Sequence, residues 1–214
     1  MSRSDVDAAR IRLSERSETK PLGDLGDGIL LRPLLAGDGI GLADGYARNR
    51  AHLAPWEPLR SEDYFTPARQ DEMVARTLQD AADGRSAPYV LTDQRERIVG
   101  RVNLSDIVRG AFWSGHLGYW IDADLAGRGI MRRAVATVCA LARDDLGLHR
   151  VQAATLLHNE ASQRVLRAVG FTEIGRAERY LRIAGEWQDH LLFQLLLEDA
   201  AAIGAPVSPA PARP

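Results

Sequence analysis

The amino-acid sequence predicts an α/β fold in which helices flank a mixed β-sheet. Short apolar runs with the spacing of strands alternate along the chain with segments whose apolar residues recur every three or four positions. Two pairs of strands are joined by short polar or glycine-containing turns, which are typical of hairpins. The predicted order is a strand, two helices, three strands, a helix, a strand, a helix and two strands. This order indicates a sheet that is parallel in its middle and antiparallel elsewhere.

The first half of the chain opens with a strand that ends at Pro33. It continues with a helix, an irregular loop, a second helix and two strands. In this order, and beginning with the opening strand, the predicted ranges are 29–33, 38–50, 52–65, 66–84, 87–92 and 97–104. Thr66 followed by Pro67 is a typical helix start, because threonine caps the first turn and proline needs no amide partner there. The polar turn at residues 93–96 joins the last two strands as a hairpin.

The second half of the chain alternates strands and helices before a final pair of strands. The predicted residues are 114–121, 129–145, 151–157, 159–169, 172–181 and 187–197. In the helix that starts at Gly129, apolar residues from Met131 to Ala142 share one face. Gly147 and Gly170 follow the two helices, where glycine commonly ends a helix. Ala184-Gly185 forms the turn of the last hairpin.

Composition indicates one domain at residues 21–200. A chain of 214 residues, 45% hydrophobic and 26% charged, is long enough to bury a core. Residues 1–20 are polar and residues 201–214 are rich in proline and alanine, so we expect a disordered arm and a flexible tail. The net charge of −2 favours no nucleic-acid partner. Because the sequence has no signal-peptide core and no apolar stretch of ~18 residues, we expect a cytoplasmic protein with no membrane partner.

Cysteine and histidine usage predicts no metal site. The single cysteine, Cys139, lies within a helical apolar pattern, so a buried and unreactive thiol is expected. The histidines do not have the spacing of metal ligands.

The loop Gly127-Arg128-Gly129 carries the first chemical signal. It follows a strand and opens a long helix, and its glycines allow a tight turn that lets the backbone approach a ligand. The free N–H groups of the first helical turn and the helix dipole favour an anion. Arg128, Arg132 and Arg133 add positive charge. We interpret the loop as a phosphate or pyrophosphate site, although an ordinary helix entry explains the same pattern.

Two common phosphate loops do not fit this segment. A Walker loop requires Gly-Lys-Ser/Thr, which is absent, and a dinucleotide fingerprint requires a third glycine where the chain has Arg132. The remaining interpretation is that the loop binds a different cofactor that contains a pyrophosphate.

A second motif lies about thirty residues later, directly after a strand. Residues 159–171 have the form Asn-x-x-Ser-x-x-Val-Leu-x-x-x-Gly-Phe. Together with Gly127-x-Gly129, this motif resembles the GNAT superfamily of N-acetyltransferases. Further blocks resemble its ribosomal-protein-alanine N-acetyltransferase branch, and these are Leu31–Leu34 with Asp38, Leu117–Ile121 and Gly185–His190. The resemblance spans roughly residues 28–198.

The resemblance implies the GNAT fold, a central, mostly antiparallel sheet with a splayed parallel pair, and acetyl-CoA as co-substrate without a metal. The pantetheine arm is expected between the strand that ends near Ile121 and the strand at 151–157. The cofactor-binding residues implied are Tyr119, Trp120, Ile121, Gly127, Arg128, Gly129, Ile130, Met131, Arg132 and Asn159. One position departs from the family pattern, because Asp124 stands where a glutamine or arginine is usual, which puts side-chain help from that position in doubt.

The resemblance also implies direct attack of an amine on the thioester. A backbone N–H near Tyr119–Ile121 is expected to stabilise the carbonyl oxygen. The catalytic candidates are Ser162, as the acid that protonates the leaving sulfur, and His116, as the base. Glu160 is a second candidate base. Structural roles explain some of these residues equally well, since Asn159 is a good helix cap and Ser162 the third residue of that helix.

The expected acceptor is the N-terminal α-amine of a protein or peptide, by resemblance a ribosomal protein. An α-amine with a pKa of about 8 is partly neutral at pH 7, so a weak base or a water path suffices. Trp56, Glu57 and the loop around them are expected to shape the acceptor site. Two alternatives remain open, acetylation of a small amine such as an amino acid, polyamine or antibiotic, and a non-catalytic acyl-CoA-binding module. Relatives suggest a homodimer.

Overall fold

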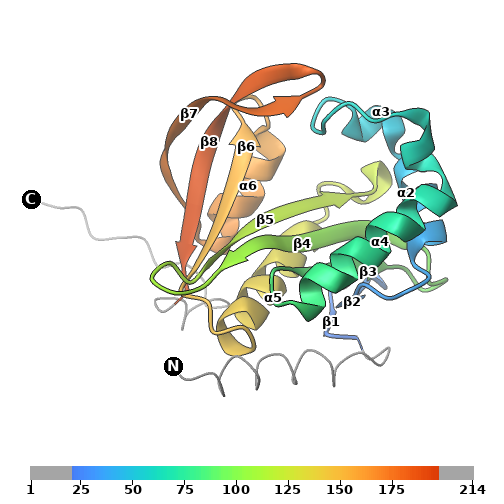
Figure 1. The fold of residues 1–214 in the computed structure, drawn as a ribbon, viewed down its shortest axis with the longest axis horizontal. Coiled ribbons are helices and arrows are strands. Elements are labelled where there is room, and N and C mark those ends of the chain that lie inside the picture. Colours follow the sequence, from blue (N-terminus) through green and yellow to red (C-terminus); the bar gives the residue numbers. More distant parts are fainter. Residues whose placement is uncertain (1–20, 198–214) are drawn as a thin grey trace, which may run out of the picture.

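The computed structural model describes residues 21–197, so the predicted arm at 1–20 and tail at 201–214 lie outside the described residues. The described strands form one sheet in the order β1-β2-β3-β4-β5-β6-β8-β7 (Figure 1). Their bounds are Gly23–Asp24 (β1), Leu30–Pro33 (β2), Ala87–Thr92 (β3), Ile98–Val108 (β4), Ser114–Ile121 (β5), Arg150–Leu156 (β6), Thr172–Ile183 (β7) and Glu186–Leu196 (β8). Only the pair β5 and β6 is parallel within this sheet. The predicted mixed sheet is confirmed.

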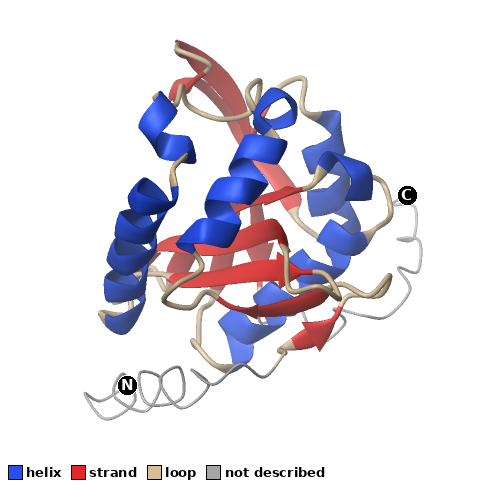
Figure 2. Ribbon diagram, turned by 90° about the vertical axis from the view of Figure 1, so that its right-hand side faces the viewer, coloured by secondary structure: helices blue, strands red, loops and turns tan. Residues whose placement is uncertain are grey.

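Helices cover both faces of the sheet (Figure 2). The α-helices are Gly39–Arg48 (α2), Arg50–Leu53 (α3), Pro67–Ala82 (α4), Ile130–Asp144 (α5) and Glu160–Val169 (α6), and the 3-10 turns are Glu62–Phe65 (η1) and Ala123–Leu125 (η2). Helix α4 begins as predicted, since the Thr66 hydroxyl accepts a hydrogen bond from the Arg69 N–H at 3.3 Å.

Three details differ from the sequence prediction. The segment expected to be an irregular loop at 52–65 holds the end of α3 and the turn η1. The short elements β1 and η2 were not predicted, because two or three residues carry no periodic pattern. Strand β4 continues to Val108, beyond its predicted end, and its register with β5 shifts between Ser105 and Val108. A bulge of this kind lets a strand bend and continue.

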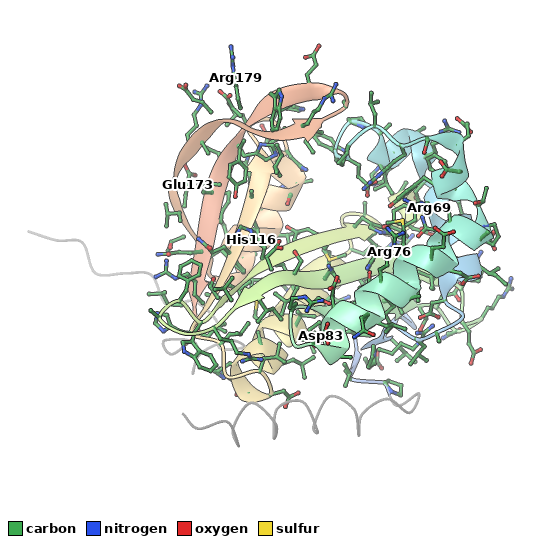
Figure 3. All side chains as sticks on the ribbon, in the orientation of Figure 1. Arg69, Arg76, Asp83, His116, Glu173 and Arg179 are labelled. Carbon is green, nitrogen blue, oxygen red and sulfur yellow. The ribbon has the colours of Figure 1, made fainter. Side chains whose placement is uncertain are left out.

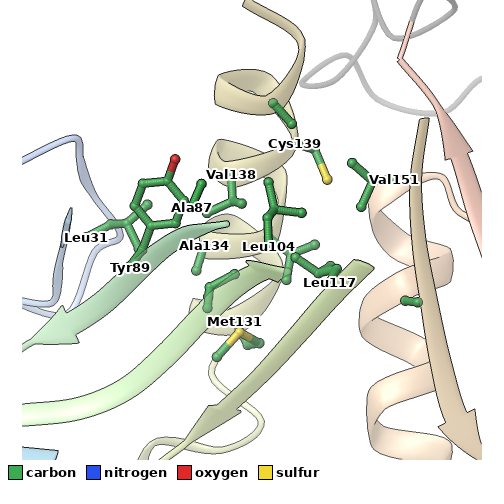
Figure 4. Packing of buried hydrophobic residues seen from close by; sticks show 14 of the residues in the cluster. Leu31, Ala87, Tyr89, Leu104, Leu117, Met131, Ala134, Val138, Cys139 and Val151 are labelled. Carbon is green, nitrogen blue, oxygen red and sulfur yellow. The ribbon is translucent and has the colours of Figure 1, made fainter. Parts of the chain in front are cut away.

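Two hydrophobic cores lie on opposite faces of the sheet. The larger one packs Ala134, Val138 and other residues of α5 against Leu104 and Leu117 (Figure 4). Cys139 belongs to it and is fully buried, which raises the pKa of its thiol to about 12. The smaller core contains buried residues of α2, α4 and the sheet, namely Leu34, Leu42, Tyr46, Leu53, Tyr64, Val74, Val90, Ile98 and Trp120.

The parallel strands β5 and β6 separate along their length (Figure 1). Their paired residues run from Ser114 with Arg150 to Leu117 with Ala153, and within the described chain no pairing continues beyond that point. Both strands nevertheless extend further, to Ile121 and Leu156. The predicted splayed pair is therefore confirmed, and it leaves an opening in the middle of the sheet.

Candidate active site

A cleft of about 520 Å³ lies at the opening between β5 and β6. This volume falls in the range of small-molecule sites. Its walls come from the end of β5, the loop that leads into α5, one face of α6 and the segment around α3. The lining residues are His52, Leu53, Trp56, Glu57, Tyr119, Trp120, Ile121, Leu125, Ala126, Gly127, Gly129, Ile130, Met131, Arg132, Asn159, Ala161, Ser162, Arg164, Val165 and Ala168.

The glycine loop forms one end of the cleft. Gly127 and Gly129 have φ angles of +78° and +73°, a left-handed conformation that favours glycine. A Cβ at Gly127 would meet no heavy atom within 4 Å, so the loop leaves space beside its backbone. Helix α5 starts at Ile130 with no acidic residue in its first turn, and its amides remain available to an anion. The loop therefore fits a phosphate group.

The arginines near this loop have different positions. Arg132 lines the cleft, whereas Arg128 is exposed and does not line it. Arg133 turns towards the β1–β2 connection, where its Nε donates to the Leu25 carbonyl and its Nη2 lies 3.6 Å from Asp27. Asp124 is exposed and also lies outside the cleft lining. Of the three arginines, the structure thus directs one into the cleft.

A polar network anchors the loop to α2. Asp122, which follows β5, accepts hydrogen bonds from the Arg48 guanidinium at 3.0–3.1 Å and from the Asn49 side chain. The Asn49 side-chain oxygen accepts the backbone N–H of Ala123 at 3.0 Å. Asn49 is buried, so its contacts are shielded from water. This network fixes the point at which the chain leaves β5 and enters the loop.

Tyr119 on β5 and Ser162 on α6 meet across the cleft. Their hydroxyl oxygens lie 2.7 Å apart, and the Tyr119 hydroxyl also lies 3.2 Å from the Ser162 carbonyl, to which it can donate. Burial raises the pKa of Tyr119, and the hydrogen bond with Ser162 lowers it by less. Both hydroxyls are therefore neutral near pH 7 and can pass a proton. Asn159 caps α6 by accepting the Ser162 N–H at 3.1 Å, and it also lines the cleft.

The main chain of β5 presents hydrogen-bonding groups to the opening. Two hydrogen bonds at the ends of this strand show which way its backbone groups point. Just before β5, the Trp113 carbonyl accepts the Arg150 N–H of β6 at 3.1 Å. Just after β5, the Asp122 N–H points to the opposite side and donates to the Val99 carbonyl of β4 at 2.8 Å. Because the direction of backbone groups alternates along a strand, the N–H groups of Tyr119 and Ile121 face the opening. Since pairing with β6 ends at Leu117, these groups are available to a ligand.

His116 and Glu160 lie away from the cleft lining. His116 is on β5 where that strand is still paired, opposite Gln152 of β6 (Figure 3). Its side chain points to the opposite face of the sheet from Tyr119, because alternate residues of a strand face opposite sides. Glu160 is 78% exposed and pairs with Arg164 at 3.3 Å. Neither candidate base is brought to the cleft, whereas Ser162 and the other predicted cofactor residues apart from Arg128 line it.

The wall opposite the glycine loop comes from α3 and the residues after it. The Trp56 ring lies 5.4 Å from the His158 ring, and the Glu57 carbonyl accepts the Ala184 N–H at 2.9 Å. Sequence reasoning named Trp56, Glu57 and the loop around them, and that loop includes His52 and Leu53 of the cleft lining. Sequence reasoning missed the α6 positions that line the cleft, namely Ala161, Arg164, Val165 and Ala168. Their helical spacing was an available signal.

Residues 21–197 contain neither a cluster of metal ligands nor a membrane-spanning helix. No group of three or more His, Cys, Asp or Glu side chains in this range could hold a metal ion. No helix in the same range is long and apolar enough to cross a membrane.

Comparison with known proteins gives consistent matches. Residues 29–172 match the family described as "Acetyltransferase (GNAT) domain". The chain is 34% identical over 174 residues to the ribosomal protein uS5-alanine N-acetyltransferase of Escherichia coli K12, covering 81% of this chain and 90% of that protein.

Two solved structures extend the similarity to the fold. A ribosomal-protein-S5-alanine acetyltransferase from Vibrio fischeri has a TM-score of 0.78 and 37% identity, covering 81% of this chain and 95% of that one. Mycobacterium smegmatis RimJ in complex with CoA-disulfide has a TM-score of 0.77 and 29% identity, covering 82% and 85%.

Proposed function

The chain belongs to the GNAT acetyltransferase family and is an acetyl-CoA-dependent N-acetyltransferase, and we propose that its acceptor is the N-terminal α-amine of a ribosomal protein. The observation that carries the acceptor is the 34% identity, over 90% of its length, to an enzyme named for the alanine of ribosomal protein uS5. The open cleft supports it, because a polypeptide N-terminus needs access to the thioester from outside.

The cleft supports the following arrangement of acetyl-CoA. Its pyrophosphate lies against the amides from Gly127 to Met131, beside Arg132. Its pantetheine arm enters the opening and pairs with the free backbone groups of β5. The thioester then lies between Tyr119 and the segment that contains Glu57. Asn159 supports this placement from the start of α6.

Acetyl transfer in this arrangement needs three contributions from the chain. A main-chain N–H of Tyr119 or Ile121 stabilises the negative charge that develops on the thioester oxygen. The amine nitrogen forms a bond to the carbonyl carbon as the carbon–sulfur bond breaks. The thiolate that leaves receives a proton from Ser162, and the hydrogen bond at 2.7 Å lets Tyr119 resupply that proton.

An acceptor panel tests the proposal. Release of free thiol from acetyl-CoA is measured with peptides that begin with alanine, with the same peptides blocked at the α-amine, and with amino acids, polyamines and aminoglycosides. We expect turnover of the free peptides alone, with the acetyl group on the α-amine by mass spectrometry. Turnover of small amines alone would establish the small-amine alternative. Binding of acetyl-CoA without any turnover would instead indicate a binding module.

Two further properties belong to this proposal. An acceptor that is a ribosomal protein places the enzyme in the cytoplasm, and co-fractionation with ribosomal proteins tests this. The homodimer stays a prediction, for which light scattering on the purified full-length chain gives the molecular mass.

A further inference from the structure

Residues 54–60 form a segment that bridges the two sides of the opening. On one side the segment continues from α3, and Leu53 packs in the same core as Tyr46 and Trp120. On the other side the Trp56 ring lies 5.4 Å from the ring of His158, which follows β6, at a tilt of 37°. The Glu57 carbonyl is tied to the β7–β8 turn through the Ala184 N–H. These contacts hold the Glu57 backbone across the wide end of the opening.

The Glu57 side chain points inwards from this segment. It is 21% exposed, and it lines both the main cleft and a second cavity of about 130 Å³. Leu53 lines both spaces as well, so the two residues form the wall between them. The second cavity is otherwise bounded by residues of α2, α3 and the following loop, namely Tyr46, Arg50, Ala54, Pro58, Leu59, Arg60 and Phe65.

One oxygen of the Glu57 carboxylate is available to a ligand. Oε2 accepts a long hydrogen bond from the Arg60 Nε at 3.4 Å, whereas Oε1 accepts none from the described residues 21–197. Burial raises the pKa of Glu57, and Arg60 and Arg101 lower it by less. A carboxylate whose pKa is raised is a stronger proton acceptor.

We propose that Glu57 is the catalytic base, whose carboxylate binds the acceptor ammonium and takes its proton as the nitrogen attacks the thioester. The proposal rests on the amine acetylation stated above. The ammonium passes its first proton to Glu57, the nitrogen–carbon bond forms, and the carbon–sulfur bond breaks as the nitrogen loses its second proton to solvent. The sulfur receives a proton from Ser162, which regains one from solvent by way of Tyr119. Glu57 later returns its proton to solvent, so protons balance over a turnover.

Other titratable groups that face Glu57 do not replace it. Arg60 and Arg101 are permanently charged donors and cannot accept a proton. Burial strongly raises the pKa of Tyr64, which therefore stays neutral. His52 is exposed on α3 and lines the cleft, so H52Q is assayed beside E57Q and is expected to keep the pH profile of the wild type. Arg50, at the second cavity, pairs with Glu62.

The pH dependence separates this role from a structural one. An α-ammonium with a pKa of about 8 is only ~1% neutral near pH 6. With Glu57 as base, the ammonium form is productive, so kcat/KM of the wild type changes little between about pH 6.5 and 7.5. Glu57→Gln leaves only the neutral amine productive. Its kcat/KM then rises about tenfold per pH unit up to about pH 8.

The experiment measures kcat/KM across this pH range for the wild type, E57Q, E57D and the matched control E72Q, with whichever amine the wild type accepts. Glu72 is 60% exposed on α4, pairs with Arg69 and lies outside the cleft. We expect E57Q to fall about 100-fold or more near pH 6, with a deficit that shrinks as the pH rises. E57D should regain the wild-type shape, and E72Q should match the wild type. Coenzyme A affinity should be unchanged in all variants.

Three results would overturn the proposal: an E57Q deficit that is equal at every pH, a deficit under twofold near pH 6, or a wild-type kcat/KM that itself follows the amine pKa. The last measurement needs no variant, so it decides even if E57Q fails to fold. A wild type that accepts only small amines would refute the proposed acceptor but still test Glu57 with that amine. A wild type that accepts no amine would refute both.

Discussion

Replacing Gly129 by glutamate tests whether the glycine loop binds the cofactor phosphates. Gly129 caps α5 with φ of +73° and ψ of 2°, and it lines the cleft. An L-residue in this conformation costs about 1–2 kcal/mol. The new Cβ would lie 3.3 Å from Nη1 of Arg133, the end of a flexible side chain that can move. A domain of this kind has about 5–15 kcal/mol of stability, so we expect the variant to fold.

The expected loss of affinity follows from the new charge. A carboxylate about 4 Å from a phosphate charge is repelled by about 4 kcal/mol at an effective dielectric constant of about 20. Because each ~1.4 kcal/mol is a factor of ten in affinity, coenzyme A binding should weaken about 1,000-fold. Added salt should reduce this deficit, since the mechanism is electrostatic and the cleft is open to solvent.

Calorimetric titration with coenzyme A and urea unfolding measure the two effects separately. Gly110→Glu is the matched control, because Gly110 has φ of +72°, is exposed and lies outside the cleft, and a Cβ at this position would meet no heavy atom within 4 Å. It should lose similar stability and keep wild-type affinity. Gly129→Ala should retain most of the affinity. A folded Gly129→Glu variant that binds coenzyme A as tightly as the wild type would refute the loop assignment.

Three further predictions concern groups around the cleft and in the core. Ser162→Ala should lower kcat by about 10²–10⁴, whereas Tyr119→Phe should cost about fivefold because a neutral hydrogen bond contributes about 1 kcal/mol; steady-state kinetics measure both. Cys139 should resist a disulfide reagent in the native state near pH 8, because its pKa is about 12. Folding raises the pKa of Cys139, so the folded state favours the neutral thiol. The resulting stabilisation is complete below about pH 8.5 and is lost as the pH rises towards 12. Asp122→Ala should lower the free energy of unfolding by about 1–3 kcal/mol, because Arg48 loses its carboxylate partner.

Each of these predictions has an outcome that contradicts it. Wild-type kcat in Ser162→Ala would remove that hydroxyl from sulfur protonation. Equal thiol labelling of Cys139 with and without urea would contradict its burial. An unchanged midpoint of unfolding in Asp122→Ala would show that the network with α2 contributes no net stability. The control for the last variant is Asp83→Ala, on a partly exposed helix end away from the cleft.

Much of the fold was predictable because it is encoded locally. Strand β5 and helices α4, α5 and α6 have boundaries within about two residues of their predicted positions, since caps, glycines and apolar spacing act over a single turn or strand. The element β1 was not predictable, because its two residues become a strand only by pairing with β2. The segment 52–65 was also predicted poorly, since its turns are short and Pro55 and Pro58 suggest a loop.

The glycine loop was predictable from the sequence, because a ligand that binds to backbone amides selects residues that are adjacent in the chain. The identity of the cofactor followed from the resemblance to the family. Gly127 and Gly129 have the left-handed φ angles that their residue type favours. The choice of base depended on tertiary structure. His116 and Tyr119 are three residues apart but face opposite sides of β5.

Glu57 reaches the cleft only because its segment contacts His158 and Ala184, more than one hundred residues later in the chain. Tyr119 and Ser162 likewise meet only through the sheet and α6. The sequence by itself therefore determined most of the helices and strands and the glycine loop, whose causes lie within a few residues. The tertiary structure decided which side chains share the cleft, because that depends on contacts between segments that no local pattern encodes.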